Sequence, residues 1–390
     1  MTCSKLLENV QKPYQYVGYE ENTYNKDFDS ARLRFCLAFP DAYEIGMSNV
    51  GMQIIYHIIN EHPDHMCDRV YTPLIDMGDA LQEAGKPLTA RESDRALNEF
   101  DIVGFTLQYE MAYTNVLYML ELGKIPRYTK DRKEHDPFVI AGGPCVFNPE
   151  PVADFFDFFV IGEGEEVITE VCEVIENCRR QGVSRQETLR RAGQVKGIYV
   201  PQFYLPRYTE DGRFDELVRT ADAPKWVERR VVADLDTIAY PTQPVTPAIR
   251  PIHERISVEI QRGCTRSCRF CQAGYIYRPR RERSPQKIVD IIEESVKSTG
   301  VQDIGLLSLS SADYSHIHPL MRAVMDRYKK EHLSISLPST RLEALKEEYL
   351  DVLKEERRSG FTIAPEAGSQ RLRNVINKNF TEDEIVETAR

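Results

Sequence analysis

The sequence predicts an α/β protein with two domains, each built on a parallel sheet. The chain has 390 residues, and chains longer than roughly 250–300 residues tend to divide because a single hydrophobic core stops growing. Apolar strand-like runs alternate with helical patterns in both halves, and a proline-rich stretch separates them at 240–251. We expect a first domain at 1–196, a small sheet with proline-rich connections at 197–254, and a second domain at 255–390.

The first domain is expected to contain four strands. They cover residues 33–39, 101–107, 138–141 and 158–161. Helical patterns cover residues 51–59, 111–122 and 166–177. This alternation favours a doubly wound parallel sheet, and such sheets bind ligands at the carboxyl ends of their strands. The residues at those ends are Asp41, Thr106, Gly142, Gly143 and Gly162.

A second series of strands and helices begins at residue 256. Its expected strands cover residues 256–261, 305–310, 334–338 and 360–364. The last segment of the sequence opens like a helix with a capping box, in which Thr381 is the cap and Glu384 follows three residues later.

The composition is that of a globular protein. Hydrophobic residues make up 42% of the sequence, and no apolar run approaches the roughly 20 residues needed to cross a bilayer. The first residues lack the apolar core of a signal peptide, so we expect a cytoplasmic protein. The 50 basic and 61 acidic residues give a net charge of -11, which disfavours a nucleic-acid partner because such proteins usually have a basic surplus.

Nine cysteines in a cytosolic chain point to metal or redox chemistry, since thiols are kept reduced there. Cys264, Cys268 and Cys271 follow an expected strand with the spacing C-x3-C-x2-C. A loop of this kind can wrap one face of an iron–sulfur cube, and three protein ligands leave one iron open for a substrate. Gly263 lets the backbone approach closely, and the arginines around the cysteines favour ionised thiolates.

Two other interpretations of these cysteines are a structural zinc site and buried, inert thiols. Zinc would need a fourth Cys or His nearby, and none follows closely in residues 272–285. We therefore favour the iron–sulfur interpretation. The scattered cysteines are expected to be small buried residues: Cys36, Cys145, Cys172 and Cys178.

At the three clustered cysteines the sequence resembles the radical S-adenosylmethionine superfamily, whose signature has the same spacing and an aromatic residue before the last cysteine, here Phe270. The resemblance implies a partial (βα) barrel with a [4Fe-4S] cluster on Cys264, Cys268 and Cys271. The open iron would bind the amino and carboxylate groups of S-adenosylmethionine. One electron would then cleave its C–S bond, giving methionine and a 5'-deoxyadenosyl radical that abstracts hydrogen from a substrate.

The same resemblance implies further contacts with S-adenosylmethionine at strand ends. In the superfamily the second strand ends in a glycine-rich acidic motif that holds the methionine amino group, and this sequence lacks those glycines. The expected contacts are Ser310, Ser311, Asp313, Ser339, Arg341 and Glu366. Glu366 and Ser369 equally suit the start of a helix, where an acid and a serine are common caps.

Over nearly the whole chain the sequence resembles radical enzymes with an N-terminal cobalamin-binding domain of Rossmann or flavodoxin-like fold. The loops at 39–48, 104–110, 141–144 and 161–166 carry this resemblance. Cobalamin domains place a histidine below cobalt in the motif Asp-x-His-x-x-Gly, where this sequence has Asp41, Tyr43 and Gly46. Tyrosine is a poor cobalt ligand, so the resemblance implies a corrin without a protein histidine.

The resemblance places Thr106 and the turn of Gly142 and Gly143 along the nucleotide tail of the corrin. The alternative is a domain that keeps the flavodoxin-like shape without the cofactor, or that binds something else. Both remain open at the level of sequence.

Together these features predict a radical S-adenosylmethionine enzyme that catalyses methylation or another C–H functionalisation, with a reductase, flavodoxin or ferredoxin as electron donor. The alternatives are a cobalamin-independent enzyme acting on RNA and a non-catalytic iron–sulfur electron carrier. Radical barrels continue through two more strands than the four expected here, and a parallel sheet cut at that point exposes an edge. We therefore expect the chain to be the N-terminal portion of a longer enzyme, or to be completed by a partner subunit.

Overall fold

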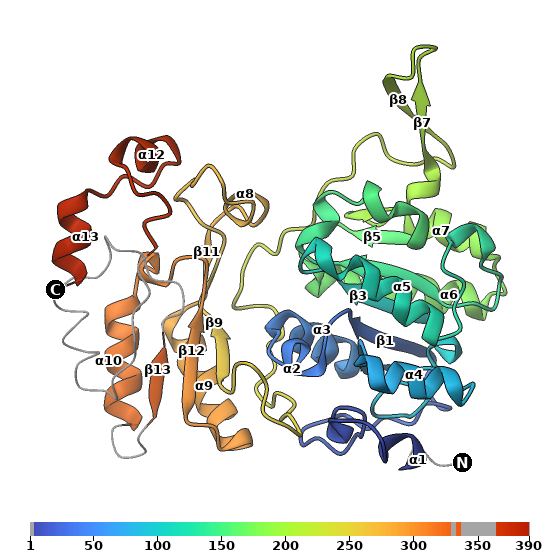
Figure 1. The fold of residues 1–390 in the computed structure, drawn as a ribbon, viewed down its shortest axis with the longest axis horizontal. Helices are drawn as coiled ribbons and strands as arrows, with labels where there is room; N and C mark the ends of the chain where they lie inside the picture. Colours follow the sequence, from blue (N-terminus) through green and yellow to red (C-terminus); the bar gives the residue numbers. More distant parts are fainter. Residues whose placement is uncertain (1–3, 329–332, 337–363, 390) are drawn as a thin grey trace. The chain divides into compact units, whose positions relative to one another are not determined.

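The computed structural model describes residues 4–328, 333–336 and 364–389, which Figure 1 shows as a ribbon. The chain folds into two compact units. The first comprises Met1–Val232 and Val245–His253, and the second comprises Ala233–Pro244 and Glu254–Arg390. The region 197–254, expected to link two domains, is thus divided between them.

The first unit contains a six-stranded sheet with the strand order β2-β1-β3-β4-β5-β6. The strands are β1 (Leu33–Phe39), β2 (His65–Tyr71), β3 (Ile102–Thr106), β4 (Phe138–Gly142), β5 (Phe158–Val160) and β6 (Ile198–Tyr199). The first five are parallel and β6 is antiparallel. The order 2-1-3-4-5 is that of flavodoxin-like folds, which bind ligands where the winding reverses between β1 and β3. The predicted doubly wound fold is confirmed.

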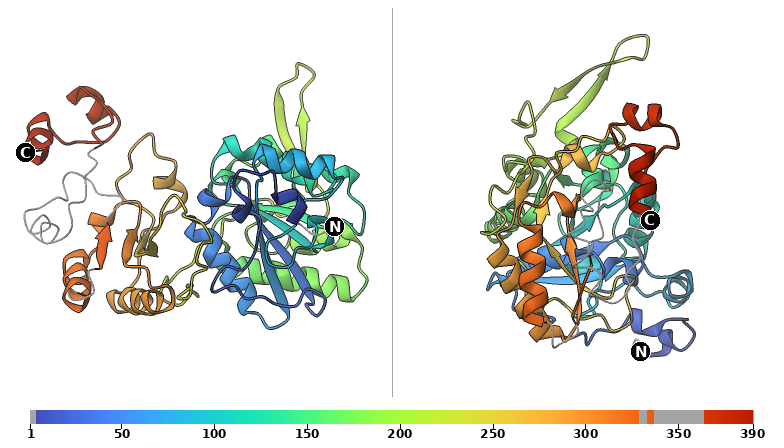
Figure 2. Two further views of the ribbon diagram at one scale, coloured as in Figure 1. Left: turned by 60° about the horizontal axis from the view of Figure 1, so that its bottom comes forward. Right: turned by 90° about the vertical axis from the view of Figure 1, so that its left-hand side faces the viewer.

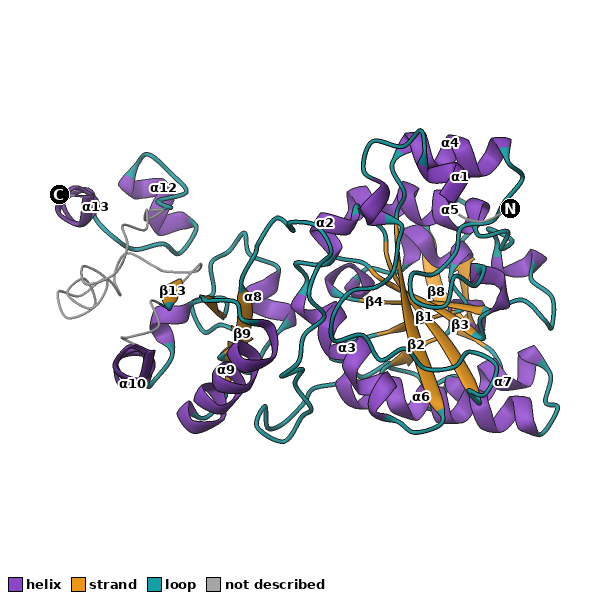
Figure 3. Ribbon diagram, turned by 90° about the horizontal axis from the view of Figure 1, so that it is seen from below, coloured by secondary structure: helices purple, strands orange, loops and turns teal. Residues whose placement is uncertain are grey.

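Helices cover both faces of this sheet, as Figure 3 shows. One face carries α3 (Val50–Glu61), α6 (Gly164–Arg180) and α7 (Arg185–Ala192), and the other carries α4 (Ile75–Glu83) and α5 (Tyr113–Leu122). The short helix α1 (Ser4–Leu7) packs against α4, and the short helix α2 (Tyr43–Gly46) follows β1. Helix α3 begins where the side chain of Asn49 accepts a hydrogen bond from the amide of Met52 at 2.9 Å, as an N-cap residue does.

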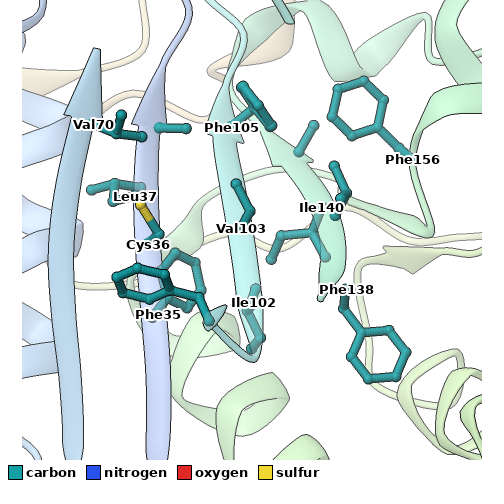
Figure 4. Packing of buried hydrophobic residues seen from close by; sticks show 14 of the residues in the cluster. Phe35, Cys36, Leu37, Val70, Ile102, Val103, Phe105, Phe138, Ile140 and Phe156 are labelled. Atoms are coloured by element: carbon teal, nitrogen blue, oxygen red, sulfur yellow. The ribbon is translucent and has the colours of Figure 1, made fainter. Parts of the chain in front are cut away.

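The core of the first unit lies between the central strands and these helices. Side chains from β1, β3 and β4, such as Phe35, Val103 and Ile140, pack side by side in Figure 4 and are almost fully buried. Strands buried on both faces appear in sequence as continuous apolar runs. This explains why the positions of these three strands could be predicted.

Strand β2 and helix α4 were not predicted, and β2 forms one edge of the sheet. All seven residues of β2 are buried, including Asp68 and Arg69. An N-terminal segment covers this edge. From that segment Glu20 pairs with Arg69 at 2.6 Å, and the Nζ of Lys26 donates to the carbonyl of His65 at 2.8 Å.

The small sheet expected between the domains is an antiparallel hairpin of β7 (Tyr204–Tyr208) and β8 (Phe214–Arg219). It stands out from the first unit in Figures 1 and 2. After the hairpin the chain enters the second unit at 233–244, where the hydroxyl of Tyr240 donates to the carbonyl of Ser257 at 2.8 Å. It then returns to the first unit at 245–253, where the amide of Ala248 donates to the hydroxyl of Tyr43 at 2.9 Å.

The second unit contains three parallel strands in the order β13-β12-β9. They are β9 (Ile256–Glu259), β12 (Asp303–Leu307) and β13 (Ser334–Ser336), and β10 (Gln261–Arg262) pairs with β11 (Arg281–Glu282) beside them. The helices are α8 (Ala273–Ile276), α9 (Pro285–Thr299), α10 (Ile317–Tyr328), α12 (Gln370–Val375) and α13 (Glu382–Ala389). The expected strand at 360–364 lies outside the described residues except for its last position.

The end of the described chain confirms the capping box. The amide of Thr381 donates to Oε2 of Glu384 at 2.6 Å, and the amide of Glu384 donates to the hydroxyl of Thr381 at 3.2 Å. Within the ranges that the structure describes, no helix is both long and apolar enough to cross a membrane.

Candidate functional site

Residues 263–271, here called the cysteine loop, follow β9 and β10 at the carboxyl end of the second unit's sheet. Gly263 begins the loop with φ +83°, a conformation that favours glycine. A Cβ at this position would lie 2.5 Å from the carbonyl oxygen of Tyr277. Glycine is therefore required at position 263, because the backbone at Tyr277 leaves no room for a Cβ. This is a different reason from the predicted approach to a cluster.

All three thiols of the cysteine loop are partly exposed. The backbone amide of Arg266 lies 3.4 Å from Sγ of Cys264, and that of Gly274 lies 3.4 Å from Sγ of Cys271. Hydrogen bonds to sulfur and partial exposure are features that tune an iron–sulfur cluster. The donor set, three thiolates with backbone amides directed at two of them, therefore fits a cluster held by cysteine.

The scattered cysteines have quite different surroundings. Cys36, Cys145, Cys172 and Cys178 are all buried, as predicted. Burial raises the pKa of the thiols of Cys36, Cys145 and Cys172, so they stay protonated. Protonated, buried thiols are neither nucleophiles nor good metal ligands.

The geometry also bears on the zinc alternative. Among the residues that the structure describes, no three His, Cys, Asp or Glu side chains converge closely enough to share one metal ion. A single-ion site would need such convergence, whereas in a cube each cysteine binds its own iron. Within the described residues, Cys264, Cys268 and Cys271 are accordingly not grouped as the ligands of one ion.

The residues predicted to contact S-adenosylmethionine on the second strand have varied surroundings. Ser311 is buried and its hydroxyl donates to the carbonyl of Leu306 at 3.1 Å. Ser310 is also buried, and within the described part of the chain its Oγ has no hydrogen-bond partner. Both carboxylate oxygens of Asp313 accept hydrogen bonds from Arg266 in the cysteine loop. Ser310 thus has an unused polar group, while Ser311 and Asp313 are engaged within the protein.

Two other predicted residues meet at Lys378. Its Nζ lies 2.9 Å from Oε1 of Glu366 and 5.9 Å from the centre of the Phe270 ring, and that ring is half exposed. Ser369 caps α12, because its side chain accepts from the amide of Leu372 at 3.3 Å. Ser339 and Arg341 lie outside the described residues.

Sequence reasoning missed Asn377 and Lys378. Asn377 donates hydrogen bonds to Arg266 and Ser267, which lie more than 100 positions earlier in the chain. Lys378 lies near the ring of Phe270 in the cysteine loop. No short motif joins positions so far apart, so nothing in the sequence alone could have identified them.

The first unit offers a second candidate site at the carboxyl ends of β1, β3 and β4. Asp41 follows β1 and accepts a hydrogen bond from the hydroxyl of Tyr109, which follows β3. Thr106 ends β3 and accepts from Nε2 of Gln108 at 2.6 Å. Tyr109 is partly exposed, and Met111 beside it is 84% exposed. Large exposed side chains at a winding reversal are typical of a ligand-binding surface.

The two glycines after β4 differ. A Cβ on Gly143, whose φ is +101°, would lie 2.6 Å from the carbonyl oxygen of Leu107. A Cβ on Gly142 would have no neighbour within 4 Å. Gly143 is therefore needed for the fold, while Gly142 faces open space where a ligand could lie.

Tyr43 and Gly46, which were expected beside a corrin, are packed in the interior of the first unit. Tyr43 is 1% exposed, and its hydroxyl donates to Glu20 and accepts from the amide of Ala248. A Cβ on Gly46 would lie 2.3 Å from the ring of Tyr71. The motif around them shapes the loop after β1 through packing.

Two protein families match this chain. Residues 51–201 match the family described as radical SAM proteins, N-terminal, and residues 258–390 match the radical SAM superfamily, where SAM is S-adenosylmethionine. The cysteine loop lies in the second match.

Two relatives are similar in sequence. An uncharacterised protein of Methanocaldococcus jannaschii is 28% identical over 354 residues, which cover 90% of this chain and 64% of that protein. The anaerobic magnesium-protoporphyrin IX monomethyl ester cyclase of Cereibacter sphaeroides is 30% identical over 253 residues, covering 61% of this chain and 36% of the cyclase. The chain thus spans less than two thirds of the length of either relative.

Several solved structures share the fold, among them the following two. One is the radical S-adenosylmethionine methyltransferase TsrM of Kitasatospora setae with cobalamin and a [4Fe-4S] cluster bound, at 15% identity and a TM-score of 0.57, covering 91% of this chain and 66% of that one. The other is the cobalamin-dependent S-adenosylmethionine radical enzyme OxsB, at 13% identity and a TM-score of 0.57, covering 92% of this chain and 47% of that one.

Proposed function

Because this chain belongs to the radical S-adenosylmethionine superfamily, we propose that it binds a [4Fe-4S] cluster and cleaves S-adenosylmethionine reductively. The ligands are Cys264, Cys268 and Cys271. The observation that carries this proposal is the cysteine loop itself, in which three partly exposed thiols follow β9 and backbone amides point at two of the sulfurs.

The cluster, when bound, supplies one electron that breaks the C–S bond of S-adenosylmethionine to give methionine and a 5'-deoxyadenosyl radical. The protein's part is to hold the thiolates and to present polar groups to the bound molecule. Ser310 has an unused Oγ after β12, the strand beside β9. The electron comes from a reductase, flavodoxin or ferredoxin. All eight cysteines that the structure describes are free thiols, which is the state that reducing conditions maintain.

We further propose that the first unit binds cobalamin at the carboxyl ends of β1, β3 and β4. Three observations support this: the flavodoxin-like strand order, the open space at Gly142, and the exposed Tyr109 and Met111. The similar structures of TsrM and OxsB both contain bound cobalamin. A protein that holds both a corrin and a source of radicals suits methylation, in which one S-adenosylmethionine donates a methyl group and a second gives 5'-deoxyadenosine.

Anaerobic reconstitution tests both proposals. The purified chain is given iron, sulfide, hydroxocobalamin and a chemical reductant, and the products from S-adenosylmethionine are separated by chromatography. A radical enzyme gives 5'-deoxyadenosine, and a cobalamin-dependent methylase also gives S-adenosylhomocysteine and a corrin absorbance. A chain that takes up the cluster but gives no 5'-deoxyadenosine would be an electron carrier, and the proposed cleavage would be wrong.

A further inference from the structure

The cysteine loop is held by two segments of the second unit that are distant from it in sequence. One is the turn at 310–315 after β12, and the other is the segment at 376–378 after α12. We propose that Asp313 and Asn377 are positioning residues, which fix the backbone of the loop so that its three thiols face a common cluster. The proposal rests on the proposed function, because it takes the three thiols to be the ligands of a cluster.

Asp313 acts on the loop through Arg266, which lies between Cys264 and Cys268. The Nε of Arg266 donates to Oδ2 of Asp313 at 2.7 Å, and its Nη2 donates to Oδ1. A guanidinium bound by both oxygens of one carboxylate is fixed in orientation as well as in distance. The main-chain carbonyl of Asp313 also accepts from Arg280 at 2.8 Å, so the turn that carries the carboxylate is itself held.

Asn377 acts on the next turn of the loop. Its Nδ2 donates to the carbonyl oxygens of Arg266 at 2.9 Å and of Ser267 at 3.1 Å. Ser267 has φ +56°, a left-handed conformation that is unfavourable for a residue with a Cβ. The two bonds from Asn377 thus stabilise the loop at its most strained point. The amide of Arg269 adds a third bond, to the carbonyl of Ile376 at 3.1 Å.

The loop residues that form these bonds lie between the cysteines in sequence. Arg266, Ser267 and Arg269 are tied to the protein by their main chain or side chains, and the thiols of the cysteines remain partly exposed. The loop is therefore oriented by the residues between its ligands. Asp313, which was predicted to hold the methionine amino group, acts here on the loop.

The test is cluster retention in the reconstituted chain, measured without S-adenosylmethionine. In Asp313→Asn and in Asn377→Ala, a chelator should remove iron roughly tenfold faster than from the wild type, as is typical when a residue that supports a metal ligand is removed. The electron paramagnetic resonance spectrum of the reduced cluster should change as well, because its ligands are less well oriented. Thermal unfolding is measured in parallel to show that each variant is folded.

Two further variants sharpen this test. If Asp313 acts through Arg266, the double variant Arg266→Ala, Asp313→Asn should lose iron no faster than Arg266→Ala alone. If Asp313→Asn does not fold, Arg266→Lys takes its place, since lysine keeps the charge but cannot make the two-bond contact. The matched control is Glu293→Gln, which removes an ion pair with Lys297 of 2.7 Å on α9 and should retain iron like the wild type.

The outcomes separate this inference from the proposed function. Wild-type iron retention and an unchanged spectrum in both single variants would overturn the positioning role and leave the cluster assignment standing. A wild-type chain that takes up no cluster would refute the proposed function itself. If Asp313→Asn retained its cluster but bound S-adenosylmethionine less tightly, Asp313 would contact that molecule directly and the inference would be wrong.

Discussion

The thiols of the cysteine loop and the buried thiols should respond differently to substitution. In Cys264→Ala, Cys268→Ala and Cys271→Ala we expect loss of the brown cluster absorbance and of 5'-deoxyadenosine, because a cube held by two protein ligands is not retained. The matched control is Cys172→Ala, since Cys172 is fully buried in the first unit. It should lower the free energy of unfolding and leave iron content unchanged. A full iron complement in any loop variant would refute the ligand assignment.

Adjacent Gly142 and Gly143 allow a second test at the residue scale. Gly143→Ala should destabilise the first unit by about 1–3 kcal/mol, because the conformation is open only to glycine and the new Cβ meets Leu107. Gly142→Ala should leave stability nearly unchanged, since a Cβ there meets no atom. Denaturant unfolding measures both. If cobalamin lies beside Gly142, the same alanine should weaken its binding in a spectroscopic titration.

The N-terminal segment that covers β2 makes the first unit sensitive to acid. Burial raises the pKa of Glu20, but Arg69 and Arg91 outweigh it and the net pKa lies below 4.5. Glu20 therefore contributes stability that is present above pH 4.5 and is lost as the pH falls through the lower folded-state value. Burial also lowers the pKa of His65 below 6.5, which keeps the folded imidazole neutral. Below pH 6.5 this histidine takes up a proton more readily in the unfolded chain, so the free energy of unfolding falls. Stability of the first unit should decline from about pH 6.5 downward.

Glu20→Gln tests the part that is due to Glu20. It should lower the free energy of unfolding at pH 7 by about 3 kcal/mol, because it removes a partner of the buried Arg69. The difference from the wild type should shrink in acid, where the wild type loses the same interaction. Glu187→Gln is the control, because Glu187 forms exposed ion pairs on α7 that contribute little. A difference that stays constant with pH would contradict the assignment.

The loops at the carboxyl ends of β1, β3 and β4 lead to a prediction about corrin coordination. Residues 40–49, 106–113 and 142–148 contain no histidine, and Tyr43 is buried with its hydroxyl in use. Hydroxocobalamin bound there should show no nitrogen coordination from the protein. Electron paramagnetic resonance of the cobalt(II) form measures this directly, and a histidine-ligated signal would show that the corrin lies elsewhere or is held differently.

The elements of the fold differ in how far the sequence predicted them. Strands β1, β3 and β4 are buried on both faces by apolar residues, so their patterns were clear. Strand β2 is just as buried, but it contains His65, Asp68 and Arg69, whose partners come from distant segments. Asp68, for example, accepts from the amide of Ser93 at 2.8 Å. A strand whose polar groups are satisfied only in the folded state has no apolar pattern to detect.

The residues of the candidate site also differ in how far the sequence predicted them. The three cysteines lie within one short loop, so their spacing alone identified them as candidate ligands. Asp313 was predicted as a site residue, but its contact with Arg266 could not be predicted because it depends on the pairing of β9 with β12. Asn377 reaches the loop only through the folded chain, and no local pattern in the sequence indicates it.

The whole molecule has an unusual path between its two units. Residues 233–244 belong to the second unit and residues 245–253 to the first, so the chain passes between the units three times. Each segment is bound on its own side: Tyr240 to Ser257 in the second unit, and Ala248 to Tyr43 in the first. Neither unit is continuous in sequence as a result.

Recombination and proteolysis should both reveal this path. A gene fusion made at one boundary would separate a unit from one of its two segments. Exchange of the first unit between relatives therefore requires 245–253 to move with 1–232, while 233–244 stays with 254–390. A protease that cuts near Pro244 produces two fragments, and each unit is then built from segments of both fragments. The two fragments should then elute together in native chromatography and separate only in denaturant.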